Sequence, residues 1–176
     1  MEQQQNPHRR SGIIMLAIAW MLVFGLAYWY FSGWEQRQLN PNPQALLEQQ
    51  GGELVLKHNR AGHYVADGEI NGAKVTFLVD TGATQVALAP QLGRRLGLKL
   101  GAPITLNTAN GSVTGYLTRL AEVRLGPIAM HDVGAVVSEG MDQQTVLLGM
   151  SFLRRLEFTQ RGEYLILKQP GLSPAH

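Results

Sequence analysis

The stretch Phe77-Leu78-Val79-Asp80-Thr81-Gly82-Ala83 decides the fold of this chain. Its three leading apolar residues predict a buried strand, which ends on a carboxylate followed by a hydroxyl side chain and a glycine. A buried charge without partners costs free energy, so an aspartate at this place needs a partner or a function. Taken alone, Asp80-Thr81-Gly82 is also typical of an ordinary turn that ends a strand.

A second element with two apolar residues and a glycine, Leu147-Leu148-Gly149, follows later in the chain. It leads into Met150-Ser151-Phe152-Leu153, and we expect a short helix over residues 149–156. The sequence Gly149-Met150-Ser151 only half resembles a nucleophile elbow, because the closing glycine is missing. Helix packing is therefore the better interpretation for Ser151.

Short apolar runs separated by turn residues extend over residues 52–169 and predict an all-β barrel with one or two short helices. The Asn-Gly pair at 71–72 is a strong hairpin signal between two of these runs. A short helix is expected over residues 90–96, since proline is tolerated in a first helical turn. The expected strands are 53–57, 63–70, 73–79, 86–89, 104–108, 112–120, 123–125, 128–131, 134–137, 146–148, 158–159 and 164–167.

Residues 12–31 contain neither a charge nor a proline, and as a helix they would rise about 30 Å, the thickness of a bilayer core. Basic residues at 8–10 precede the run and aromatic residues cluster at 28–34, as at a membrane interface. A core helix would be shorter with a polar stripe, and a cleaved signal peptide would end in a small-x-small site. The run predicts a transmembrane anchor with residues 1–11 in the cytoplasm and the chain beyond outside, in the periplasm of a Gram-negative cell.

Residues 32–51 contain Asn40-Pro41-Asn42-Pro43 and predict a tether, and residues 170–176 predict a tail. The chain has no cysteine, which excludes disulfides and thiolate ligands. Its histidines show no metal spacing, so we expect no metal and no cofactor. From residue 52 onward 12 Lys and Arg are interspersed with 10 Asp and Glu, without the basic stripe of a nucleic-acid-binding protein.

The two elements together resemble retropepsin-like aspartic proteases. The stretch from Phe77 to Ala83 is similar to their active-site loop, and Leu147-Leu148-Gly149 is similar to the second signature, which packs behind that loop. The stretches Thr108-Ala109-Asn110-Gly111 and Leu148–Leu153 resemble the membrane-anchored bacterial branch. The resemblance covers residues 60–168, about two-thirds of the chain.

Thr108, Ala109, Asn110 and Gly111 surround a second Asn-Gly hairpin signal. Its position between the two signatures favours a flap that closes over a peptide and excludes water. From the residues alone, a plain surface hairpin fits as well.

The resemblance implies that two carboxylates share one proton and activate a water molecule for peptide hydrolysis. Asp-Thr-Gly occurs once, and the other domain aspartates lack the Thr-Gly context, so a homodimer is implied in which the Asp80 residues of two chains meet on a two-fold axis. Thr81 would bond across that axis, Gly82 would let the backbone approach the substrate, and Ala83 would keep the loop small.

The chain departs from the viral pattern at Thr84 and Met150, where viral enzymes commonly carry an acid and an arginine. Support for the loop must therefore be apolar or arranged in another way. The expected function is that of a membrane-anchored aspartic endopeptidase that cleaves extended peptides. The alternative is a non-catalytic module of the same fold that binds a peptide or assembles a complex at the membrane. A third possibility is that the enzyme's role is to process its own tether.

Overall fold

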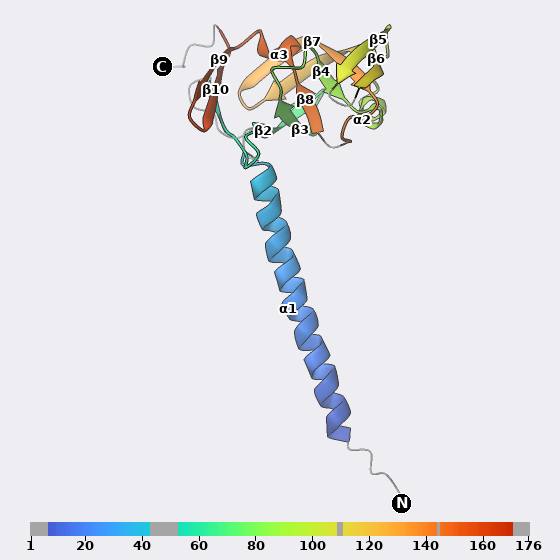
Figure 1. Cartoon of the computed structure of the whole chain (residues 1–176), viewed down its shortest axis with the longest axis vertical. Helices are drawn as coiled ribbons and strands as arrows, with labels where there is room; N and C mark the ends of the chain where they lie inside the picture. The colour runs from blue at the N-terminus through green and yellow to red at the C-terminus, as the bar shows by residue number, and fades with distance from the viewer. Residues whose placement is uncertain (1–6, 43–52, 109–110, 144, 171–176) are drawn as a thin grey trace, which may run out of the picture. The chain divides into compact units, whose positions relative to one another are not determined.

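The computed structural model describes residues 7–42, 53–108, 111–143 and 145–170 (Figure 1). It divides into two units, Met1–Gln38 and Leu39–His176, which are described separately. The first contains nearly all of helix α1 (Pro7–Leu39), for which side chains are described at residues 14–30 and at Leu39. The second is a β-domain.

Helix α1 extends beyond the apolar run at both ends, because it begins at Pro7 and ends at Leu39. Proline is well suited to a first helical position, and the helix stops before Asn40-Pro41 because proline disfavours helical backbone in the residue that precedes it. Residues 7–11 and 32–39, expected in the tail and the tether, are therefore helical. Within the described residues no helix is both long and apolar enough to cross a membrane, so the anchor stays a prediction.

The β-domain consists of strands with two brief helices, as the sequence predicts. In chain order the described elements are β1 (Glu53–Lys57), β2 (Val65–Ile70), β3 (Ala73–Val79), β4 (Val86–Leu88), α2 (Pro90–Arg95), β5 (Pro103–Thr108), β6 (Gly111–Leu125), β7 (Ile128–Ser138), β8 (Thr145–Leu148), α3 (Met150–Leu153), β9 (Glu157–Arg161) and β10 (Tyr164–Lys168).

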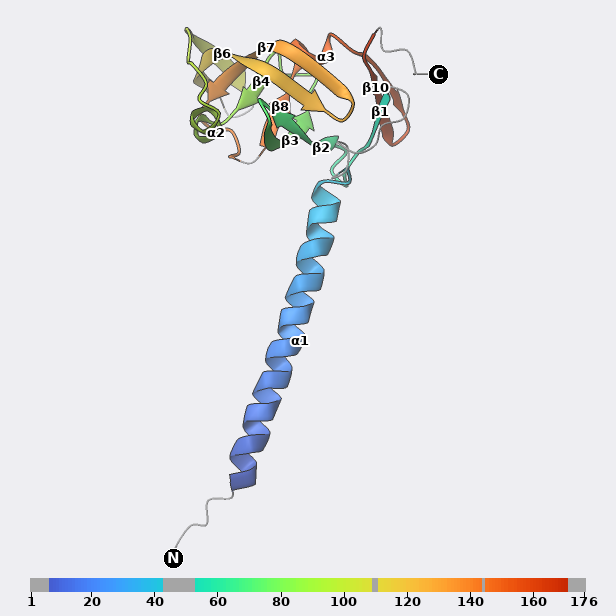
Figure 2. The same cartoon turned by 180° about the vertical axis from the view of Figure 1, so that it is seen from behind.

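Seven of these strands form one sheet, in the order β2-β3-β8-β4-β7-β6-β5. The sheet closes into a barrel because the end of β2 also pairs with β6, through Glu69 with Arg124 and Ile70 with Val123. Closure removes the edges that an open sheet would expose. The barrel core holds fully buried side chains, and Phe77, Leu88, Leu120, Ile128, Leu148 and Phe152 are among the largest of them. Figure 2 shows the strands of the barrel from behind.

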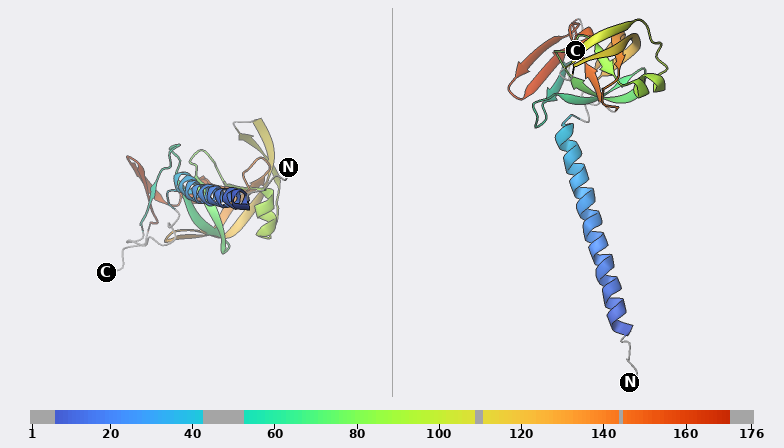
Figure 3. Two further views of the ribbon diagram at one scale, coloured as in Figure 1. Left: turned by 90° about the horizontal axis from the view of Figure 1, so that it is seen from below. Right: turned by 45° about the vertical axis from the view of Figure 1, so that its right-hand side comes forward.

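The remaining strands form a three-stranded antiparallel sheet in the order β1-β10-β9. The first strand pairs with the last one along its whole length, from Glu53 with Lys168 to Lys57 with Tyr164. In Figures 1 and 3 the hairpin of β9 and β10, coloured red, lies at the opposite end of the domain from β5.

Two expected pairs of short strands are in fact two long strands. Residues 112–120 and 123–125 belong to β6, which has 15 residues, and residues 128–131 and 134–137 belong to β7, which has 11. The strands stay in register through Asp132, although its φ angle is 52°, because Leu120 pairs with Val133 and Glu122 with His131. Asp132 therefore does not interrupt β7, because β7 stays paired with β6 on both sides of it.

The segment 40–42, expected to belong to the tether, is hydrogen-bonded to the β-domain. The side-chain amide of Asn42 donates to the carbonyl oxygens of Lys57 and Val65 at 2.8 Å each, and its Oδ1 accepts from the Lys57 backbone nitrogen at 2.9 Å. Asn40 donates from Nδ2 to Oδ1 of Asp67 at 2.9 Å. Residues 40–42 of the expected tether are therefore part of the domain.

Candidate active site

Asp80 directly follows β3 and is half-buried in the single chain, whereas Thr81 and Gly82 are exposed. Its backbone nitrogen donates to the carbonyl oxygen of Leu148 at 3.2 Å, which fixes the loop to β8. Its Oδ1 accepts a hydrogen bond from the Gly82 backbone nitrogen at 2.9 Å, and its carbonyl oxygen accepts from Ala83 at 3.3 Å. The loop is thus a tight turn that orients the carboxylate of Asp80.

Strand β8 runs parallel to β3 and places the second signature beside this loop. Leu78 pairs with Leu147 and Val79 with Leu148, so the two signatures end side by side. Leu148 is fully buried in the barrel core, and Leu147 is half-buried. The contact between the two signatures expected from the sequence is therefore observed.

Gly149 lets the backbone after the loop lie directly against α3. A β-carbon on residue 149 would stand 2.7 Å from the carbonyl oxygen of Ala83, and it would come closer still to that of Gln85. Both oxygens are backbone atoms that cannot move away without shifting the loop. Glycine is required here because no side chain fits.

Backbone hydrogen bonds brace the loop where an ion pair supports it in the viral pattern. Met150 donates from its backbone nitrogen to the carbonyl oxygen of Ala83 at 2.8 Å, and Ser151 donates to that of Thr84 at 3.0 Å. These bonds also satisfy donors at the start of α3, which have no partner within the helix. Thr84 and Met150 thus support the loop through their main chains.

The hydroxyl of Ser151 has a specific role that its residue type did not reveal. Ser151 is 4% exposed, and its Oγ accepts a hydrogen bond from the backbone nitrogen of Val86 at 3.0 Å. The bond links α3 to the start of β4, 65 residues apart in sequence. The sequence predicts only helix packing for Ser151, whereas its hydroxyl also makes this hydrogen bond.

The predicted flap is the hairpin of β5 and β6, which pair from Pro103 with Tyr116 to Thr108 with Gly111. Near its tip the Thr108 hydroxyl donates to the carbonyl oxygen of Gly111 at 2.7 Å. Ala109 and Asn110, which were expected to form the turn, lie outside the described residues. The described part is an exposed two-stranded arm whose role as a flap stays a prediction.

The aspartates that lack the Thr-Gly context are engaged with other groups. Asp67 accepts hydrogen bonds from Asn40 and from the Thr76 hydroxyl at 2.9 Å each. Asp132 forms an ion pair with Arg119, and Asp142 accepts from the Thr145 hydroxyl at 3.4 Å. None of these contacts directs a second carboxylate of the described chain toward Asp80.

Comparisons with known proteins agree with this geometry. The family model described as "gag-polyprotein putative aspartyl protease" matches residues 66–155, about half of the chain, including both signatures. An uncharacterised protein of the cobV 5' region of Sinorhizobium sp. is 33% identical over 170 residues, which cover 89% of this chain and 73% of the relative. The uncharacterised protein RP867 of Rickettsia prowazekii is 33% identical over 109 residues, 60% of this chain and 46% of that protein.

A solved structure is similar as well, the retropepsin-like aspartic protease of Rickettsia conorii. It is 34% identical with a TM-score of 0.58, and the match covers 67% of this chain and all of that one. The matched family model, the Asp80 loop braced by β8 and α3, and the closed barrel lead to one assignment: this chain belongs to the retropepsin-like aspartic protease family.

Proposed function

We propose that this protein is an aspartic endopeptidase that works as a homodimer, with Asp80 of each chain as the catalytic carboxylate. The observation that carries the proposal is the Asp80 loop. Hydrogen bonds to Leu148, Gly82 and Ala83 hold it at the end of β3, and the residues after it are braced by α3. The same loop is one of the two elements on which the family resemblance rests.

In the proposed mechanism two Asp80 carboxylates lie close together and share one proton, since both cannot ionise at that distance. The ionised one takes a proton from water, whose oxygen attacks the carbonyl carbon of the scissile peptide bond. The protonated one gives its proton to the carbonyl oxygen. The carboxyl that took the water proton gives it to the leaving nitrogen, and the carbon–nitrogen bond breaks. One hydroxyl of the tetrahedral diol gives its proton to the other carboxylate, so the pair again shares one proton.

The free edge of β9 supports the homodimer. Among the described strands β9 has one partner, β10; all five of its residues are exposed, and Phe158 is 45% exposed. An unpaired edge is a template for another strand. At the opposite edge, Asn42 already occupies the backbone nitrogen and carbonyl oxygen of Lys57. A second copy joined at β9 would continue the sheet across the dimer.

We also propose that residues 12–31 anchor the protein in the cell membrane, with its N-terminus in the cytoplasm and the protease domain outside. The support is the uncharged run with basic residues before it and aromatic residues at its end. Membrane fractionation after alkaline carbonate extraction tests the anchor, which predicts that the protein stays in the pellet. Protease treatment of spheroplasts tests the orientation, which predicts that the β-domain is digested.

The test of the catalytic proposal compares full-length wild type with Asp80→Asn on an unstructured peptide library. We expect kcat/KM to fall about 10³-fold or more, because the variant lacks the carboxylates that transfer protons. Asp142→Asn is the matched control, since Asp142 is an exposed aspartate without the Thr-Gly context. Unchanged cleavage by Asp80→Asn would refute the mechanism. A wild-type protein that stays monomeric and cleaves nothing would favour the non-catalytic module.

A further inference from the structure

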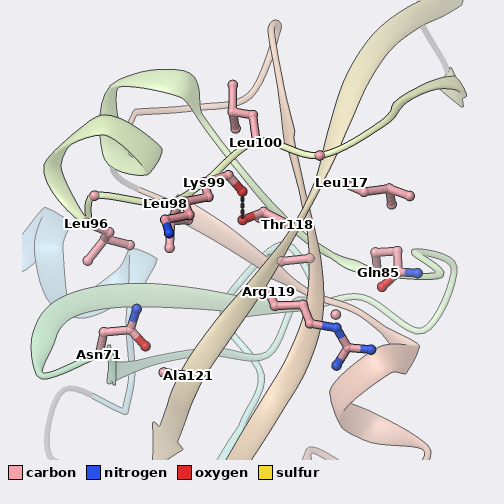
Figure 4. A pocket seen from close by; sticks show the side chains of 14 residues that line it. Asn71, Gln85, Leu96, Leu98, Lys99, Leu100, Leu117, Thr118, Arg119 and Ala121 are labelled. Carbon is pink, nitrogen blue, oxygen red and sulfur yellow. Dashed lines mark hydrogen bonds between the residues drawn. The ribbon is translucent and has the colours of Figure 1, made fainter.

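A cavity of about 710 Å³ lies beside β6 (Figure 4). Its walls come from the loop that follows α2, from the middle of β6, from Gly134 and Ala135 of β7, and from Gln85. Among the described residues, Asp80, Thr81 and Gly82 do not line it. The cavity is therefore separate from the candidate active site.

The lining combines apolar and positively charged side chains. Four leucines belong to it: Leu96, Leu98, Leu100 and Leu117. Lys99 and Arg119 are the charged residues of the described lining, and no carboxylate contributes to it. Leu100 is 54% exposed, although a large apolar side chain gains free energy from being covered. The charge and the apolar surface together suit a ligand that carries both an anion and an apolar group.

Arg119 uses only part of its guanidinium for hydrogen bonds to the described residues. Its Nη1 makes both contacts with Asp132, one with the carboxylate and one with the carbonyl oxygen at 3.3 Å. Within the described part of the chain, its Nη2 and Nε donate no hydrogen bond. A guanidinium has five N–H donors in a planar fork that matches a carboxylate. Arg119 can therefore bind a second carboxylate without releasing Asp132.

Gln85 lies next to Arg119 and has an unused acceptor. Gly134 connects the two residues, because it pairs with Arg119 across β6 and β7, and a β-carbon on it would stand 2.7 Å from Oε1 of Gln85. That oxygen is buried and has no hydrogen-bond partner among the described residues. A buried amide oxygen without a partner is rare in native proteins and costs free energy. If the Gln85 side chain turns so that this oxygen faces the cavity, a donor from a ligand recovers that loss.

We propose that this cavity binds the C-terminal end of a peptide whose last residue is apolar. The terminal carboxylate meets Arg119, the last peptide group meets the amide of Gln85, and the apolar side chain covers the leucines. A peptide group offers both an N–H and a carbonyl oxygen, so it satisfies the Gln85 amide in either orientation. An aliphatic acid has the carboxylate and the apolar chain, but it has no N–H for Gln85.

The bound peptide would contact the base of the β5–β6 hairpin. The loop 96–101 leads into β5 and is hydrogen-bonded to β6. The Gly101 backbone nitrogen donates to the Leu117 carbonyl oxygen at 2.7 Å. The Thr118 hydroxyl donates to the Lys99 carbonyl oxygen at 2.9 Å (Figure 4). An endopeptidase makes new C-termini, so the cavity would hold a product or the end of a substrate. That use rests on the proposed function, whereas the binding itself does not.

The test uses the full-length chain with Asp80→Asn, so that the probe is not cleaved. The probe is an acetylated pentapeptide of four alanines and a C-terminal leucine, titrated by calorimetry as the free acid and as the C-terminal amide. We expect the free acid to bind and the amide to bind at least about tenfold more weakly, since it lacks the charge for Arg119. The backbone amide resonances of Gly101 and Gly134 should shift on titration.

Arg119→Met should weaken binding of the free acid at least about tenfold. Arg124→Met is the matched control, because Arg124 is also an ion-paired arginine of β6 but does not line the cavity, and it should change binding less than about twofold. If Arg119→Met fails to fold, Arg119→Lys replaces it, since it keeps the charge, loses the fork and should still bind less tightly.

Equal binding of acid and amide, or no effect of Arg119→Met, would overturn the proposal. So would the absence of any binding up to millimolar peptide. If decanoate binds as tightly as the peptide, the ligand of the cavity is a free aliphatic acid and the proposed peptide is wrong. Binding is measured with Asp80→Asn, so it can be observed even if the wild-type protein has no protease activity. If the wild-type protein cleaves peptides but the variant binds no C-terminus, only this inference is refuted.

Discussion

Gly149 lies so close to Ala83 that a β-carbon on residue 149 would stand 2.7 Å from the Ala83 carbonyl oxygen. The contact fixes the distance between α3 and the segment that follows Asp80. Gly149→Ala should destabilise the domain by about 3 kcal/mol, since the clash is with backbone that cannot rotate away. Urea denaturation followed by circular dichroism measures the loss. Gly25→Ala, with nothing within 4 Å, should leave unfolding of the β-domain unchanged.

Ser151→Ala should destabilise the domain by about 1–3 kcal/mol. The substitution removes the acceptor of the Val86 backbone nitrogen and leaves a buried donor without a partner. Ser112→Ala is the control, because its hydroxyl makes an exposed hydrogen bond to Asn107. Chemical denaturation of both variants gives the difference. Equal losses would show that the link between α3 and β4 contributes nothing specific.

Asn42→Ala should destabilise the domain by about 2 kcal/mol, because it removes three hydrogen bonds to the backbone of Lys57 and Val65. Asn107→Ala, at an exposed position with one side-chain hydrogen bond to Ser112, is the control and should cost less than about 1 kcal/mol. Limited proteolysis gives a second readout. Cleavage near residue 42 should be faster in Asn42→Ala, and an unchanged rate would mean that the segment is held by other contacts.

Phe158→Lys should weaken the proposed homodimer at least about tenfold, since it places a charge at the free edge of β9. Val55→Lys is a matched control, because Val55 lies on the other edge strand of the same sheet and is 43% exposed, against 45% for Phe158. Sedimentation equilibrium at several concentrations measures both dissociation constants. A larger effect of Val55→Lys would move the interface to β1.

Glu122 should contribute stability that depends on pH. A hydrogen bond from Arg124 at 2.7 Å, more than the charge itself, holds the pKa of this carboxyl below its ordinary value of 4.5. Its contribution is therefore complete above that value and is lost as the pH falls through the lowered pKa. Melting temperatures of wild type and Glu122→Gln should differ at neutral pH and converge in acid. Glu157→Gln controls for the loss of one surface charge.

The local features of the fold could be predicted from the sequence. Asn71-Gly72 marked the turn between β2 and β3, and the apolar run 77–79 marked the strand that ends at Asp80. Both depend on backbone preferences of a few neighbouring residues. The contact between Asp80 and the second signature could also be expected, because the family resemblance relates the two elements.

Features that depend on distant residues could not be predicted. Pairing of β1 with β10 joins residues more than 100 positions apart, and nothing in either strand indicates its partner. The continuous β6 appeared as two strands because Ala121 and Glu122 interrupt the apolar pattern, whereas pairing with β7 keeps them extended. Gln85 and Arg119 were missed because neither residue type nor spacing distinguishes them, and only the fold places them beside Gly134.

The pairing of β1 with β10 also bears on how the proposed homodimer would assemble. Each chain pairs its own first and last strands, so this sheet can form within one chain before two chains meet. Only the meeting of two folded chains would be second-order. In dilute solution the turnover per chain should then rise with total enzyme concentration and level off near the dissociation constant. On a membrane, the number of chains per unit area, rather than per unit volume, would set the fraction of dimer.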